Sequence, residues 1–214
     1  MSRALSRSLS RSLPEGKITF EQFLDWLDED VHAEWIDGEV RVMSPVRPSH
    51  QHVVVFLASL LSWWTARRLP GAVLLTEPVI LKLPGELPAY SPDLLLLLPE
   101  NAERERETHV VGPADLVVEV ISSESRARDR GEKFENYEKA GVREYWMIDP
   151  ERRRAEFYVL GADGFYEPLL PDAEGTVSSR VLEGLWVKPE LFWQKPLPDL
   201  LSVLREWGLI PDVG

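Results

Sequence analysis

The chain has 214 residues, of which 44% are hydrophobic, and it contains no cysteine. This length favours one domain with a short tail over two full domains. The absence of cysteine excludes disulfides, thiolate metal sites and a cysteine nucleophile. The formal net charge of −12 argues against a protein that coats nucleic acid, because non-specific affinity for phosphates comes from Lys and Arg. It is compatible with a local metal site, since carboxylates bind hard divalent cations.

The first residues, 1–16, are rich in serine and arginine and predict a disordered tail before a single domain over residues 17–214. They contain no secretory signal, and no apolar run approaches the ~20 residues of a membrane helix. Together with the lack of cysteine, this predicts a cytoplasmic protein without a membrane segment.

The N-terminal half of the domain carries clear helix and hairpin signals. Thr19 and Gln22 form a capping-box pattern that opens a helix ending near Asp30. Asp37-Gly38 predicts a tight turn within a hairpin over Ala33–Met43. Ser49 is expected to cap a long helix that reaches Arg68 and buries one apolar face.

The remaining elements alternate between strands and helices. The following strands are expected: Val73–Leu81, Tyr90–Leu98, Asp115–Ile121, Val142–Ile148, Ala155–Leu160 and Phe165–Leu170. Residues 99–113 are charged and are expected to form a loop, and a helix is expected over Asp129–Ala140 with Gly141 as its cap. A turn near Pro189–Trp193 and a last helix around Pro198–Trp207 follow. The sequence therefore predicts an α/β fold, a mixed sheet flanked by helices.

Two acidic residues lie in segments that are otherwise apolar. Asp93 stands at the head of the run SPDLLLLL, and Glu119 lies within LVVEVI. Burying a carboxylate is costly unless it is paired or bound to a cation. Asp93 could instead cap a turn or pair with an arginine, and Glu119 could belong to a buried ion pair. Their position on neighbouring central strands favours a shared site.

Lys133 lies on the helix that follows Glu119, with Asp129 and Tyr137 four residues to either side. This spacing places the three side chains in one helical stripe. They could form an exposed Asp129–Lys133 pair beside a packed tyrosine. Alternatively, Lys133 reaches the end of the sheet, where it orients an attacking water and offsets charge on a phosphate.

Three sequence segments resemble the Uma-type endonucleases, a bacterial family of the PD-(D/E)XK nuclease superfamily. They are AEWIDGEVRVMSP, SPDLLLL and DLVVEVISSESRARDRGEKFENYEKAGVREYWMIDP. The resemblance implies a restriction-endonuclease-like fold (an αβββαβ core), with Pro92-Asp93 as the "PD" element and Glu119 as the second acidic residue. Ile121 occupies the usual lysine position, and the resemblance implies that Lys133 replaces that lysine.

A phosphodiester can be hydrolysed with the help of a divalent ion, Mg²⁺ or Mn²⁺, that is held by carboxylates. Asp93 and Glu119 are the candidate metal ligands, with the backbone carbonyl of Val120 as a third. Glu39 and His50 are candidate outer members of the site, together with Asp129 and Tyr137. The candidate phosphate-binding residues are Arg126, Arg128 and Arg130.

The sequence thus predicts a Mg²⁺-dependent endonuclease that acts on DNA as a homodimer, since cleavage of both strands needs two sites. A non-catalytic nucleic-acid-binding or regulatory module is the alternative that the acidic charge and Ile121 favour. A structural homo-oligomer is a third possibility, in which tryptophans would supply apolar contact surface: Trp63, Trp64, Trp186 and Trp193.

Overall fold

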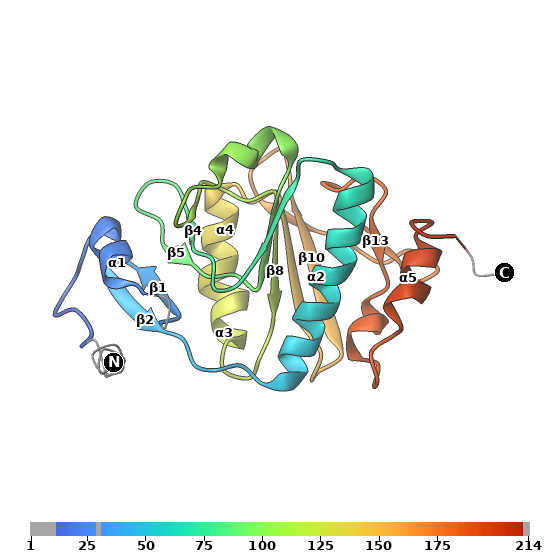
Figure 1. Cartoon of the computed structure of the whole chain (residues 1–214), viewed down its shortest axis with the longest axis horizontal. Coiled ribbons are helices and arrows are strands. Elements are labelled where there is room, and N and C mark those ends of the chain that lie inside the picture. Colours follow the sequence, from blue (N-terminus) through green and yellow to red (C-terminus); the bar gives the residue numbers. More distant parts are fainter. Residues whose placement is uncertain (1–11, 29–30, 212–214) are drawn as a thin grey trace, which may run out of the picture.

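A six-stranded mixed sheet forms the centre of the computed structural model, which describes residues 12–28 and 31–211 (Figure 1). Its strand order is β11-β10-β9-β8-β6-β3, and only β8 and β9 run parallel. The strands are β3 (Val73–Thr76), β6 (Leu94–Leu97), β8 (Leu116–Val120), β9 (Glu144–Asp149), β10 (Arg154–Leu160) and β11 (Tyr166–Pro168). The predicted mixed sheet is confirmed. Of the tail expected over residues 1–16, residues 1–11 lie outside the described residues.

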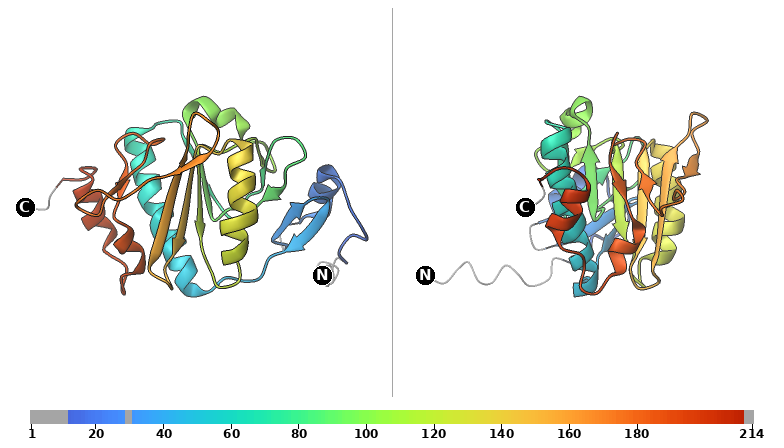
Figure 2. Two further views of the ribbon diagram at one scale, coloured as in Figure 1. Left: turned by 180° about the vertical axis from the view of Figure 1, so that it is seen from behind. Right: turned by 90° about the vertical axis from the view of Figure 1, so that its right-hand side faces the viewer.

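Helices cover both faces of this sheet (Figure 2). The long helix α2 (Pro48–Arg68) and α5 (Leu200–Glu206) pack on one face. The other face is covered by a helical run of three parts: α3 (Arg126–Arg128), the π-helical turn η2 (Asp129–Lys133) and α4 (Phe134–Ala140). Strands β6, β8 and β9 are buried along their whole length, as expected for strands covered on both faces. In the described part, no helix is long and apolar enough to cross a membrane.

A second, five-stranded sheet carries the N-terminal hairpin at one end of the molecule (Figure 1). Its order is β2 (Glu39–Val42), β1 (Ala33–Ile36), β5 (Ala89–Tyr90), β4 (Leu81–Lys82) and β7 (Val110–Val111). Helix α1 (Phe20–Trp26) packs on it and has the capping box that Thr19 and Gln22 predict. Asp37 and Gly38 both have positive φ, 52° and 88°, so the predicted hairpin turn is confirmed.

Two strands that the sequence predicts as continuous are each divided between the two sheets. The segment Val73–Leu81 contributes β3 to the large sheet and β4 to the small one, and Tyr90–Leu98 contributes β5 and β6 in the same way. Pro78 and Pro92 lie at the two breaks, where proline cannot donate a ladder hydrogen bond. The chain therefore passes from one sheet to the other at Asp93, whose carbonyl accepts from the Glu77 N–H at 3.2 Å.

Several element boundaries also differ from the predictions. Residues 99–113 are not all loop, since they contain the 3₁₀ helix η1 (Pro99–Arg104) and strand β7. Helix α2 begins at Pro48 after Arg47, without a side-chain cap, so the capping role predicted for Ser49 is wrong. A short pair was missed, β12 (Val177–Ser178) with β13 (Trp186–Val187), which is followed by η3 (Pro189–Trp193).

The four tryptophans proposed as contact surface do not share one exposed patch. Trp64 belongs to the core beneath α2, with 3% of its surface exposed. Trp186 stacks edge-on against Trp207, and Trp193 is half-buried against the same core. Trp63 is exposed, so an oligomer cannot rest on these four residues together.

The buried carboxylate of Glu144 fastens the C-terminal segment to the large sheet. Its Oε1 accepts from Trp146 Nε1 at 2.7 Å. Its Oε2 accepts from the hydroxyl of Ser179 at 2.9 Å and from the backbone N–H groups of Arg180 and Val181 at 3.0 Å. Four donors thus compensate the cost of burying this group.

We expect Glu144→Gln to lower the free energy of unfolding by about 1–3 kcal/mol, because the amide NH₂ must meet one of these donors. Burial raises the pKa of Glu144 above its ordinary 4.5, despite the hydrogen bonds that lower it. The folded chain therefore keeps a proton that the unfolded chain has lost, and the contribution of Glu144 to stability falls as the pH rises above about 4.5. Urea denaturation across this pH range should show the difference between the two proteins shrinking as the pH rises. A difference that grows with pH would contradict the raised pKa.

Candidate active site

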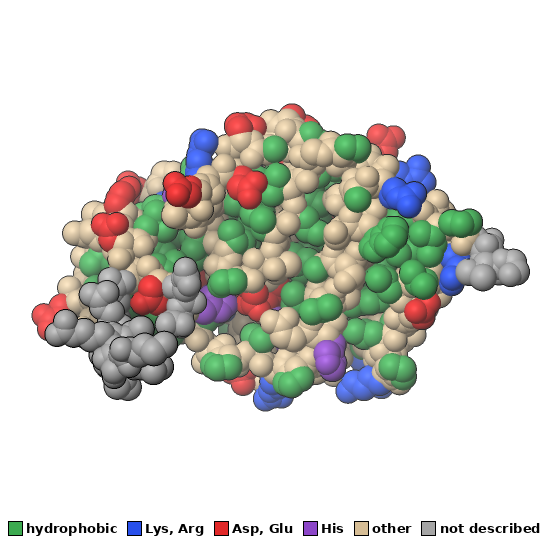
Figure 3. All heavy atoms as spheres, in the orientation of Figure 1, with side chains coloured by type: hydrophobic (Ala, Val, Ile, Leu, Met, Phe, Trp, Pro, Cys, Tyr) green, Lys and Arg blue, Asp and Glu red, His purple; other side chains and the backbone are tan. Residues whose placement is uncertain are grey.

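The main residues predicted from the sequence meet in a pocket where the two sheets and the first turn of α2 come together. Asp93, Glu119 and Lys133 all line it, as do Val120 and His50. On the face shown in Figure 3, acidic and histidine side chains gather in a hollow beside the N-terminal hairpin. The pocket has a volume of about 160 Å³, which leaves room for a few waters or ions but not for a large ligand.

Asp93 and Glu119 are brought together by strand pairing. Leu94 of β6 pairs with Val118 of β8 in an antiparallel ladder, so continuing this register places Asp93 opposite Glu119. Side chains of directly opposed residues lie on the same face, with Cβ atoms roughly 5 Å apart. Asp93 Oδ2 also accepts the Val120 N–H at 2.5 Å, which fixes the carboxylate at the end of β8.

The carboxylate of Glu119 is held by two donors from the helical run above it. Lys133 Nζ donates to Oε1 at 2.6 Å, and the Tyr137 hydroxyl donates to the same oxygen at 3.0 Å. Burial raises the pKa of Glu119 well above its ordinary value, and the charges of Asp129 and Asp93 add to the effect, against the opposing charge of Lys133. A further cation near this carboxylate would favour its ionised form.

Lys133 is buried among three carboxylates and is not part of an exposed surface pair. Its side chain is 1% exposed, and Nζ lies 3.1 Å from Glu34, 2.6 Å from Glu119 and 3.9 Å from Asp129. Burial would lower the pKa of Lys133, but the three carboxylates outweigh it and raise the pKa. The lysine lies at the end of the π-helical turn η2, where the sequence predicted an ordinary helix. Such turns are frequent at functional sites.

Glu34 is a member of this site that was not predicted from the sequence. Glu34 lies on β1 and is completely buried, with Oε1 accepting the Ser91 N–H at 3.3 Å. Burial raises its pKa, but Lys133 and Arg128 outweigh this and hold it below the ordinary value. The available signal was a glutamate between Ala33 and Trp35 in a strand whose residues are otherwise apolar.

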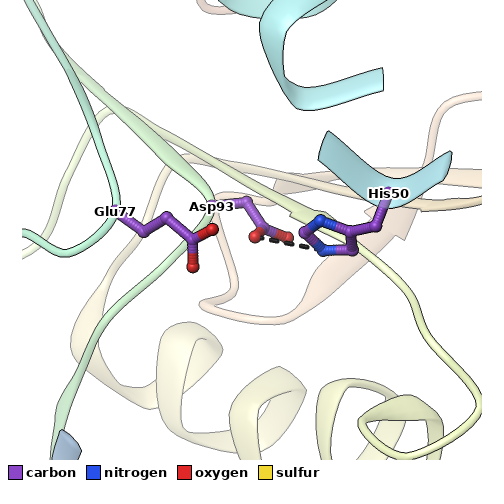
Figure 4. A group of neighbouring side chains, drawn as sticks. All are labelled: His50, Glu77 and Asp93. Atoms are coloured by element: carbon purple, nitrogen blue, oxygen red, sulfur yellow. Dashed lines mark ion pairs between the residues drawn. The ribbon is translucent and has the colours of Figure 1, made fainter. Parts of the chain in front are cut away.

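Glu77 is a second residue that the sequence analysis missed. Figure 4 shows its carboxyl group beside that of Asp93, with the His50 ring on the other side of Asp93. His50 Nε2 lies 3.2 Å from Asp93 Oδ1, so the expectation that His50 is near the site agrees with the structure. No strand pattern marks Glu77, because it follows β3 and reaches the pocket only through the break at Pro78.

The other predicted outer and phosphate-binding residues divide into two groups. Asp129 and Tyr137 contact Lys133 and Glu119 from the helical run, whereas Glu39 is exposed on β2 and does not line the pocket. Of the three arginines, only Arg128 lines the pocket, 3.6 Å from Glu34.

The remaining two arginines, Arg126 and Arg130, face acidic residues at the end of β9 and on β10. Arg126 Nε donates to Asp149 at 3.0 Å, and Arg130 pairs with Glu156 at 2.7 Å. Their charges are thus largely neutralised by partners within the chain.

Negative charge exceeds fixed positive charge around the pocket. Among the described residues, six carboxylates line the pocket or contact its lysine, against three fixed cations, Arg47, Arg128 and Lys133: those of Glu34, Glu77, Asp93, Glu119, Glu124 and Asp129. One oxygen each of Glu34 and Asp129 is buried without a hydrogen-bond partner among the described residues. Buried charges are normally paired or coordinate metal ions, so the arrangement suits an added cation.

Comparison with other proteins identifies the fold and the family of the chain. Among solved structures, the chain is similar to one described as "a putative nuclease belonging to DUF820" from Anabaena variabilis, with a TM-score of 0.66 and 16% sequence identity. The match covers 82% of this chain and 97% of that chain, and at this identity it shows the fold. No curated protein matches the chain. The family model of Uma2, "Putative restriction endonuclease", matches residues 20–191. This match includes the hairpin, both central carboxylates and the lysine-bearing helix, and the chain therefore belongs to the Uma2 family.

Proposed function

We propose that this chain hydrolyses phosphodiester bonds in DNA with a divalent cation, Mg²⁺ or Mn²⁺, bound at the pocket. The observation that carries the proposal is the excess of carboxylates around a buried lysine at one small pocket. Asp93, Glu119 and the carbonyl of Val120 are the proposed ligands. Family membership supports a nuclease, and the choice of DNA and of the cation is our inference.

The donor set suits a hard divalent cation. Both hydrogen bonds that Glu119 accepts among the described residues go to Oε1, which leaves Oε2 available to a ligand in the pocket. Carboxylate and carbonyl oxygens are the ligands that Mg²⁺ and Mn²⁺ prefer. Such an ion, when bound, would polarise the phosphate and make water more acidic.

The chain's own residues then have distinct roles. Lys133 stays protonated among its carboxylates and supplies positive charge toward the developing oxyanion. Tyr137 fixes the orientation of Glu119, and Asp93 is fixed by the Val120 N–H. Of the three arginines predicted to bind phosphate, Arg128 is the one that lines the pocket, while Arg126 and Arg130 position the segment after β8 through Asp149 and Glu156.

Cleavage of plasmid and single-stranded DNA tests this proposal directly. We expect cleavage with Mg²⁺ or Mn²⁺, no cleavage in excess chelator, and recovery when the metal is restored. Residues 1–16 should not be needed, so a variant lacking them should cleave at the same rate. A pure, folded protein that cleaves neither substrate with either metal would exclude the enzyme.

A non-catalytic binding module remains the second candidate, favoured by the net charge of −12 and by the engagement of two arginines in internal ion pairs. It predicts metal-dependent DNA binding without cleavage.

We further propose that residues 17–214 form one domain and that the chain works in the cytoplasm. We also propose that two copies pair around a two-fold axis, as cleavage of both strands requires. Sedimentation at micromolar concentration tests the pairing, since a species of only 24.5 kDa would contradict it.

A further inference from the structure

Three potential metal ligands meet in the pocket. His50 comes from the first turn of α2, Glu77 from the break after β3, and Asp93 from the break before β6. One ligand atom from each lies within 4.8 Å of the other two. All three residues line the pocket, and Figure 4 shows the two carboxyl groups and the imidazole turned toward a common region.

Neighbouring groups already hold these side chains in place. Gln51 donates to Glu77 Oε1 at 3.2 Å, and His32 Nε2 lies 3.9 Å from Glu77 Oε2. His50 lies against Asp93 Oδ1, while Oδ2 is occupied by the Val120 N–H. Such outer hydrogen bonds orient metal ligands and are typical of metal sites.

The burial of His50 provides an independent reason to expect a ligand. The residue is 6% exposed, and its Nδ1 has no hydrogen-bond partner among the described residues. Leaving a buried polar atom unpaired costs roughly 1–3 kcal/mol. A role in supporting Asp93 alone does not explain the burial of an unpaired nitrogen. A role as a metal ligand gives the buried imidazole a function, since ring nitrogens of histidine commonly bind metal ions.

We propose that His50, Glu77 and Asp93 bind a second divalent ion, of the transition-metal class, next to the ion of the nuclease site. The two ions share Asp93. This inference therefore rests on the proposed function for the ion at Glu119, whereas the ligand set of the histidine-bound ion stands independently. The imidazole sets the preference, since histidine nitrogen suits transition metals whereas Mg²⁺ favours oxygen ligands. Mn²⁺ should therefore occupy both sites and Mg²⁺ chiefly the one at Glu119.

Calorimetric titration with Mn²⁺ alone, without DNA, tests the second site. We expect two Mn²⁺ per wild-type chain and one in His50→Gln, in which the glutamine can still donate to Asp93. Affinity at the lost site should fall by at least about 10–100-fold, since even outer-sphere partners contribute that much. Mg²⁺ binding should stay unchanged. His52→Gln is the matched control, because His52 is exposed two residues further along the same helix.

A spectroscopic measurement separates coordination from a structural role. Pulsed EPR of bound Mn²⁺ should show coupling to an imidazole nitrogen in the wild type and in His52→Gln, but not in His50→Gln. Glu77→Gln should lose the same Mn²⁺ ion. Equal Mn²⁺ stoichiometry in wild type, His50→Gln and Glu77→Gln, or no nitrogen coupling in the wild type, would overturn the proposal.

Glu119→Gln distinguishes this failure from failure of the proposed function. Glu119 is not among the three ligands, so this variant should keep the histidine-bound Mn²⁺ while losing Mg²⁺. If it keeps both ions, the nuclease-site ligand set is wrong and the second site stands. If Mn²⁺ binding in Glu119→Gln shows no nitrogen coupling, the second site is wrong and the nuclease site stands.

Discussion

Asp93→Asn is expected to abolish Mg²⁺ binding at the pocket and to reduce DNA cleavage by on the order of 10³-fold or more, since a catalytic metal ion contributes several kcal/mol. Asp93 is the one side chain common to both proposed ions. Its replacement removes a negative ligand from each without changing the size of the side chain. Calorimetry with Mg²⁺ and the plasmid assay measure the two effects.

The same substitution should leave the fold intact. The asparagine oxygen can accept the Val120 N–H in place of Oδ2, and its amide can donate toward His50. Removing one of several close negative charges relieves repulsion, so the melting temperature without metal should be unchanged or higher. Asp163→Asn, in the exposed turn between β10 and β11, is the matched control. Unaltered Mg²⁺ affinity in Asp93→Asn would show that Asp93 is not a ligand.

The central sheet and the helix faces could be predicted because their signals are local. The apolar runs around Leu96 and Val118 leave few alternatives to buried strands. The spacing of apolar residues at every third or fourth position likewise predicts which residues of α2 are buried. Gly141 ends α4 in the left-handed conformation expected of a C-terminal cap, with φ of 87°.

The division of two strands between the sheets could not be predicted in the same way. Prolines at positions 78 and 92 indicate an interruption, but they do not say that the chain continues in another sheet. Glu77 lies near Asp93 only because the breaks at Pro78 and Pro92 are adjacent in the fold, where the Glu77 N–H donates to the Asp93 carbonyl. A site residue that depends on the crossing of two segments leaves no periodic signal in either segment.

The three main site residues were accessible to sequence reasoning for a different reason. Asp93 and Glu119 are charged residues in apolar strands, and such residues need a partner. The spacing of Asp129, Lys133 and Tyr137 predicts a shared stripe, which the contacts of Lys133 and Tyr137 with Glu119 reproduce. The burial of Lys133 could not be predicted, because Glu34 covers it from a hairpin about a hundred residues earlier in the chain.

The largest combined effect is expected for Lys133→Ala. Removing the ammonium leaves Glu34, Glu119 and Asp129 without their closest counter-charge, and breaking a buried pair typically costs about 3–5 kcal/mol. Thermal unfolding without metal should show this loss. Mg²⁺ should still bind, and should restore more stability than in the wild type, because it neutralises the same carboxylates.

Turnover by folded, Mg²⁺-loaded Lys133→Ala should nevertheless fall by about 10²–10⁴-fold, the effect typical of a lost acid–base or electrostatic group. Lys139→Ala is the matched control on the same helical run, since Lys139 is 61% exposed and paired with an exposed Glu135. Its stability and cleavage should match the wild type. Ile121 follows β8 directly and is buried in the same core cluster as Tyr137, so Ile121→Lys in the Lys133→Ala background should recover part of the activity. If Lys133→Ala cleaves DNA at the wild-type rate at a temperature where the variant is folded, then Lys133 stabilises the site without acting in the reaction.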